Sequence, residues 1–135
     1  MTAAPELWMP GALVTPREFT ADEIDLFRFS AATWNAHRIH YDRARAEADG
    51  LRGLPVQAHL HGAWLAQVAR SIGGSSARLR SLSWTNRAAV YACDRVRVSG
   101  VVESIDGALV GVSLTESTAE GVTSVEGSAT VEVRR

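Results

Sequence analysis

The stretch from Val56 to Ile72 limits most strongly what this chain can fold into. Its apolar side chains recur at helical spacing and cover so much of the helix circumference that a polar fringe of only four residues remains: Gln57, His61, Gln67 and Arg70. A helix that is apolar nearly all round is buried rather than laid on a surface. The sequence therefore predicts a long, buried central helix.

After Gly73-Gly74, a pair that favours a helix end, the period of the apolar residues changes. Apolar and polar residues now alternate in four segments: Leu79 to Trp84, Arg95 to Ser104, Ala108 to Thr115 and Val122 to Val133. Such alternation is typical of antiparallel strands with one buried face. Asp106-Gly107 gives a strong hairpin signal and Glu120-Gly121 a weaker one. The order predicts an α+β domain, in which a curved antiparallel sheet wraps around the central helix.

The N-terminal part of the chain predicts one further helix. Met1 to Thr15 shows no clean apolar period and is expected to be mostly irregular. Thr20-Ala21-Asp22-Glu23 has the form of a capping box, which predicts a helix start at this point. Ile24, Phe27 and Ala31 then fall on one stripe, which Leu26 and Phe29 widen, so the helix is expected to bury that face and to run into the Trp34 region.

The composition fits one globular domain over residues 1–135. With 46% hydrophobic and 21% charged residues in 135, the chain is long enough to bury a core and too short for two ordinary domains. A net charge of -1 and a pI near 6.4 offer no general attraction to nucleic acid. The single Cys93 excludes an internal disulfide, and neither a leader nor a membrane span is evident. We expect a soluble, cytoplasmic protein.

The segment from Trp34 to Asp42 carries the greatest density of reactive side chains. His40 titrates near neutrality in its ordinary state, which suits proton transfer, although a histidine satisfied by a backbone carbonyl is the structural alternative. Asp42 is placed to cap a short helix over Arg43 to Ala48, which Gly50 would end. Its alternative role is to fix the tautomer of His40.

No metal site or cofactor is predicted. His59 and His61 are two residues apart and leave a helix on different faces, so they cannot act as paired ligands. Cys93 has no base near it in the sequence that would activate its thiol.

Two motifs carry a resemblance to a known family. Asn35 to Asp42 fits the pattern Asn-x-His-Arg-Ile-His-Tyr-Asp, and Gly53-Leu54-Pro55-Val56-Gln57-Ala58 follows it after a loop. Both resemble the active-site region of MaoC-like enoyl-thioester hydratases and dehydratases, above all the 3-hydroxyacyl-thioester dehydratase and mesaconyl-CoA C4 hydratase branch. The resemblance implies a hotdog fold and a substrate that is an acyl thioester of CoA or acyl carrier protein.

The resemblance also implies roles for individual residues. The resemblance places the acid-base pair of the MaoC-like family, an Asp and a His, on Asn35 and His40, and the helix-start amide that holds the thioester carbonyl on Ala58. An amide side chain cannot accept a proton. His40 is therefore expected to be the only acid-base group, with Asn35 orienting water, or else catalysis has been lost. Gln57, which with Ala58 replaces the usual His-Gly pair, and Tyr41 are expected at the substrate; core packing is the alternative for Tyr41.

Family members close the substrate tunnel between two subunits, so the resemblance implies a homodimer or a heterodimer with another hotdog subunit. Two other functions share the fold. One is a non-catalytic subunit that binds an acyl thioester or completes a partner's active site. The other is a thioesterase, isomerase or cyclase.

Overall fold

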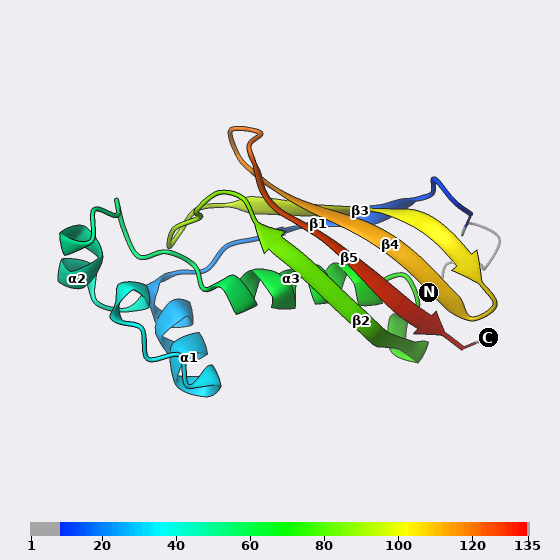
Figure 1. Cartoon of the computed structure of the whole chain (residues 1–135), viewed down its shortest axis with the longest axis horizontal. Helices are drawn as coiled ribbons and strands as arrows, with labels where there is room; N and C mark the ends of the chain where they lie inside the picture. Colours follow the sequence, from blue (N-terminus) through cyan, green and yellow to red (C-terminus); the bar gives the residue numbers. More distant parts are fainter. Residues whose placement is uncertain (1–8, 135) are drawn as a thin grey trace.

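The computed structural model describes residues 9–134 as one sheet with helices on one side of it and at one end. Its elements are, in chain order, β1 (Leu13–Phe19), α1 (Glu23–Thr33), the 3-10 turn η2 (Arg38–His40), α2 (Arg43–Ala48), α3 (Ala58–Arg70), the 3-10 turn η3 (Gly74–Ser76), β2 (Ala77–Asn86), β3 (Val96–Asp106), β4 (Leu109–Thr118) and β5 (Thr123–Val133). In Figure 1, α3 lies along the sheet, while α1 and α2 lie beyond the end at which α3 begins. No helix in this part of the chain has the length and apolarity needed to cross a bilayer.

The sheet has the strand order β1-β3-β4-β5-β2, and every neighbouring pair is antiparallel. Both predicted hairpins are present. Asp106 pairs with Leu109 across a turn in which Gly107 has a φ of 59°, and Gly121 takes a φ of 81° between β4 and β5. These left-handed conformations explain why glycine occupies both turns. All four predicted strands are confirmed, and their bounds differ from the predicted ones by three residues or fewer at each end.

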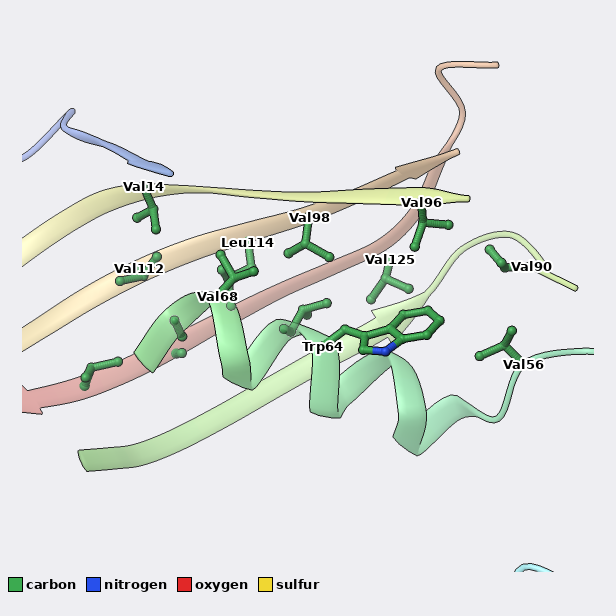
Figure 2. Close-up of a cluster of buried hydrophobic side chains, with 14 of the residues drawn as sticks. Val14, Val56, Trp64, Val68, Val90, Val96, Val98, Val112, Leu114 and Val125 are labelled. Atoms are coloured by element: carbon green, nitrogen blue, oxygen red, sulfur yellow. The ribbon is translucent and has the colours of Figure 1, made fainter. Parts of the chain in front are cut away.

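The core lies between α3 and the inner face of the sheet (Figure 2). Trp64, Leu65 and Val68 of α3 are buried against strand residues that include Val98 and Leu114. The predicted buried central helix and the α+β class are therefore confirmed.

The prediction that Met1 to Thr15 is mostly irregular is wrong from Leu13 onward. Leu13 pairs with Val101, and β1 forms an edge of the sheet. The register shifts between Val14 and Arg17, where Pro16 lacks an amide hydrogen. Edge strands and bulges are the places where a sheet accepts proline, and that interruption hides the period of the strand. Residues 1–8 of this stretch lie outside the described part.

The predicted capping box of α1 is wrong, and its buried face agrees with the prediction only in part. The N-cap is Asp22, whose carboxylate accepts from the Asp25 amide at 2.9 Å, while the Asp25 carboxylate accepts from the Asp22 amide at 3.0 Å. Ile24 and Phe27 are 60% and 59% exposed, whereas Leu26, which was predicted to widen the stripe, is buried together with Ser30. The reason is position: α1 lies beyond the end of the sheet and meets the start of α3, so it contributes Leu26 to the core and leaves Ile24 and Phe27 exposed.

The ends and the polar fringe of α3 also differ from the prediction. The helix ends at Arg70, before Gly73-Gly74, with Ser71 as its cap residue. Gln57 and His61 are buried, not part of a solvated fringe. Both find hydrogen-bond partners on elements that are distant in the sequence, as described below.

Gly62 of α3 allows a close approach between helix and sheet, and this generates a first prediction. A Cβ at this position would lie 2.6 Å from Cζ2 of Trp84, whose indole Nε1 donates to the Ala58 carbonyl. Gly62→Ala should lower the free energy of unfolding by about 1–3 kcal/mol through overpacking, measured by urea denaturation.

Gly53→Ala is the matched control, because its Cβ would meet Tyr91 at an ordinary 3.8 Å. Alanine otherwise stabilises a helix interior by about 0.5–1 kcal/mol relative to glycine. A Gly62→Ala protein as stable as the wild type would therefore contradict the close contact between Gly62 and the Trp84 ring.

Candidate active site

A cavity of about 500 Å³ lies where the segment around η2, the first turns of α3 and the chain after β2 meet. All four histidines of the chain line it, together with Asn35 and Ala58. Two of these histidines, His37 and His40, come from the η2 segment, and His59 and His61 come from α3. The fold therefore brings together three of the five residues predicted for the site: Asn35, His40 and Ala58.

His40 is held by the backbone carbonyl of Pro55. The side chain is 9% exposed, and its Nδ1 lies 2.7 Å from the Pro55 oxygen. A carbonyl can only accept, so Nδ1 carries the hydrogen, and Nε2 of the neutral ring keeps a lone pair. Pro55 is fixed in turn by its neighbours: the Val56 amide donates to the Val90 carbonyl at 2.8 Å, and the Ala92 amide donates to the Leu54 carbonyl at 2.8 Å.

Burial lowers the pKa of His40 below its ordinary value of 6.5, since desolvation disfavours the charged ring. The hydrogen bond to Pro55 opposes this change in pKa, and the nearby His37 adds to it. The neutral ring, with Nε2 able to accept a proton, is therefore the form favoured near neutral pH.

Asn35 is braced through its side-chain oxygen. Its Oδ1 accepts from the His37 amide at 3.3 Å, which leaves the NH2 group as the free donor of the side chain. His37 in turn accepts from the Ile39 amide through Nδ1 at 3.4 Å. These two short-range bonds hold Asn35 and His37 in place at the wall of the cavity.

Asp42 is the N-cap of α2, as predicted, and accepts from the Arg45 amide at 3.1 Å. Arg38 donates to the same carboxylate through Nε at 3.1 Å, and this bond lowers the pKa of Asp42. The alternative role for Asp42, fixing the tautomer of His40, is filled by Pro55 instead.

Ala58 begins α3 and lies at the cavity. The first amides of an α-helix have no partner within the helix, and the helix dipole makes this end favourable to negative charge. Within residues 9–134, the structure shows no acceptor for the Ala58 amide. A thioester oxygen in the cavity would find a donor there.

Gln57 and Tyr41 do not line the cavity. Gln57 is fully buried, and its NH2 group donates to the Leu26 carbonyl at 2.7 Å and to Oγ of Ser30 at 3.0 Å. It thus fastens the start of α3 to α1. Tyr41 is 37% exposed, donates to the Ala36 carbonyl at 2.9 Å and packs edge-on against Phe27.

The sequence analysis missed a buried network next to the cavity. Nδ1 of His61 lies 2.8 Å from Oε1 of Glu116, and Oγ of Ser124 donates to Oε2 of Glu116 at 2.6 Å. A signal was present, because Glu116 continues the inward-facing alternation of Val112 and Leu114. The strand had been predicted to end at Thr115, the residue before Glu116.

Comparison with known proteins agrees with the motifs. Residues 9–92 match the model of the hydroxyacyl-thioester dehydratase type 2 family, and the chain belongs to this family. A stretch of 46 residues is 54% identical to mesaconyl-C(4)-CoA hydratase of Chloroflexus aurantiacus; it covers 33% of this chain and 16% of that enzyme. The matched region is thus about one sixth of that relative's length.

The fold is the hotdog fold, as the resemblance implied. The (R)-hydratase from A. caviae involved in PHA biosynthesis superposes with a TM-score of 0.88 at 16% identity, covering 98% of this chain and 100% of that one. A chain of the ChsH1-ChsH2 complex from Mycobacterium tuberculosis gives 0.86 at 22% identity, with 93% and 98% covered. At such identities the likeness establishes the architecture alone.

The surroundings of His40 predict its titration. In NMR spectra of protein labelled with ¹⁵N-histidine, His40 should show the Nδ1-H tautomer and a midpoint below 6.5. Since its pKa is depressed on folding, the contribution of His40 to stability is present above pH 6.5. It is lost as the pH falls below that value, where the unfolded chain takes up the proton first. An Nε2-H tautomer would contradict the contact with Pro55, and a midpoint above 6.5 would contradict the effect of burial on the ring.

Proposed function

We propose that the protein catalyses the reversible addition of water to a 2-enoyl thioester, with His40 as the acid-base group. The observation that carries this proposal is the fixed tautomer of His40: its Nδ1 is bound to Pro55, and its ring lines the cavity beside Asn35 and Ala58. The family and the hydratase relative support the same reaction class.

In the hydration direction, the NH2 group of Asn35 donates to the oxygen of a water molecule, and Nε2 of His40 accepts one of its protons. The oxygen bonds to C3 of the enoyl group, and the π electrons move toward C2 and the thioester oxygen. The Ala58 amide and the dipole of α3 stabilise the enolate-like oxygen that results. Asn35 thus positions the water without taking up a proton.

The substrate is proposed to be a thioester of CoA or acyl carrier protein, and the protein is proposed to act as a dimer. The edge strands β1 and β2 are each paired on one side only within the described sheet, and an unpaired edge is a natural place for a second subunit. The partner would be a second copy of this chain or another hotdog subunit. The likeness to a chain of the ChsH1-ChsH2 complex supports the second kind of partner.

One observation favours a second candidate function, a non-catalytic subunit that binds an acyl thioester. Asn35 stands where the wider MaoC-like family has an Asp, while the branch that the motif resembles carries Asn itself, and an amide cannot take a proton from water. Under this reading the cavity binds acyl-CoA without turnover.

His40→Ala tests the proposal directly. Wild-type protein should hydrate crotonyl-CoA, measured as the loss of absorbance of the conjugated enoyl group, and His40→Ala should lower kcat by about 10²–10⁴-fold because the general base is gone. Circular dichroism and thermal melting should show that the variant remains folded.

Cys93→Ala is the control for thiol chemistry, since Cys93 is exposed and lies outside the cavity. It should leave hydration unchanged. Wild-type protein that binds crotonyl-CoA but leaves it intact would favour the non-catalytic subunit, and release of free CoA thiol would identify a thioesterase.

Asn35→Asp tests whether a carboxylate at position 35 would improve the activation of water. In the wild type the His37 amide donates to the Asn35 side chain, and a carboxylate can accept that bond equally well. If His40 with an oriented water suffices, the variant should change kcat for crotonyl-CoA by less than about tenfold. A gain of hundreds-fold would instead show that the native site has diverged from hydration.

A further inference from the structure

Glu116 is a carboxylate placed in the core of the sheet. It is 0% exposed, on the inward-facing row of β4. Buried carboxylates are rare unless they are paired, because removing the charge from water is costly. Two donors meet this one: Nδ1 of His61 at 2.8 Å and Oγ of Ser124 at 2.6 Å. The three members of this network lie on three different elements, α3, β4 and β5, so the network forms only when the helix packs on the sheet.

The sheet is locally distorted to complete this network. Glu116 pairs with Val125 and Ser117 pairs with Thr123, so Ser124 is the extra residue of a bulge. Both Ser124 and Val125 are buried as a result, although neighbouring strand residues normally face opposite sides. The bulge therefore turns the Ser124 hydroxyl toward Glu116.

His61 connects the buried carboxylate to the cavity. Its ring lines the same cavity as His40 and lies edge-on against Trp64, with the centroids 5.4 Å apart. Because a carboxylate accepts, Nδ1 of His61 carries a hydrogen. Among residues 9–134, no group is bonded to Nε2, the nitrogen that remains for exchange with a ligand.

We propose that His61, oriented by Glu116 and Ser124, is a second proton-transfer residue that acts at C2 of the thioester substrate. This inference rests on the proposed function and assigns its second proton. His61 follows Ala58 by three residues on α3, so the two lie on neighbouring turns of one helix face. In a thioester whose carbonyl oxygen is bound at the Ala58 amide, C2 is bonded directly to the carbonyl carbon, and C3 is one bond further away. His61 is therefore assigned to C2 rather than to C3.

The reaction then divides between two histidines. Neutral His40 takes a proton from water as its oxygen bonds to C3, and the C2–C3 π pair moves onto C2 and the thioester. Protonated His61 gives its Nε2 proton to C2, which forms the C–H bond and leaves the ring neutral. His40 ends with the added proton, and exchange with solvent returns both residues to their starting states. In dehydration each transfer is reversed, and Glu116 stabilises the positive ring that forms when His61 takes the C2 proton.

This assignment explains how the site functions with Asn35 in place of a carboxylate. The proton that a second acid-base group must transfer is carried by His61, which lines the same cavity from α3. Asn35 then needs only to donate to water.

The test isolates the C2 step. Butyryl-CoA has no double bond and no leaving group at C3, so incubation in D2O reports only removal and return of a C2 proton, seen by mass spectrometry as gained deuterium. Wild-type protein and His40→Ala should both exchange C2, whereas His61→Gln should lose exchange and crotonyl-CoA hydration by at least about 100-fold.

Glu116→Gln is the second variant, chosen to keep the fold. Its amide oxygen can accept from His61, and its NH2 group can donate to Ser124, whose hydroxyl also lies 3.2 Å from the residue 116 carbonyl. It should reduce exchange, because the charge that stabilises the His61 cation is removed. Glu103→Gln is the matched control: Glu103 also accepts from a serine, Ser113, at 2.8 Å, but is exposed and remote from the cavity. It should exchange like the wild type.

The outcomes separate this inference from the proposed function. If wild-type protein hydrates crotonyl-CoA and His61→Gln does so equally well, His61 is a structural residue and the inference is overturned while the function stands. Wild-type hydration without butyryl-CoA exchange overturns the assignment to C2. Wild-type protein that hydrates nothing overturns both.

Discussion

The packing of α3 against the inner face of the sheet determines where the chemistry can occur. Trp64, Leu65 and Val68 fill the core, so most of the helix surface is covered and only its first turns reach the cavity. The open end is also the end at which free amides and the positive pole of the helix dipole lie. The burial that stabilises the fold therefore also presents Ala58 to an anionic oxygen. Figure 2 shows Trp64 and Val68 in this core, and Val56 just before the helix begins.

Around that helix end, polar groups are held by partners from other elements. Gln57 binds α1, His40 binds Pro55, and His61 binds Glu116. Each bond satisfies a group that would be costly to leave unpaired in a buried place. One acceptor departs from this rule: within the described residues, Oε1 of Gln57 is buried without a partner.

The sequence predicted most of the architecture because hydrophobic period reports directly on burial. The apolar run of α3 and the alternation in β2 to β5 are of this kind. β1 was not predicted, because Pro16 interrupts its alternating pattern at a bulge. In the site, local motifs grouped Asn35, His40 and Ala58, and these residues line one cavity. Periodicity assigned Gln57 and His61 to a polar fringe, whereas both are buried. Polar residues on a helix are assumed to face water unless a distant partner is known, and their partners, on α1 and β4, lie 27 or more residues away.

The proposed site holds two histidines between the η2 segment and the start of α3, with the thioester carbonyl bound at Ala58. A crystal structure of the protein with bound butyryl-CoA tests this arrangement most directly. We expect the thioester oxygen at about 2.7–3.1 Å from the Ala58 amide, with C3 facing Nε2 of His40 and C2 facing Nε2 of His61. An acyl chain bound with its carbonyl away from the start of α3, or outside the cavity that these histidines line, would contradict it.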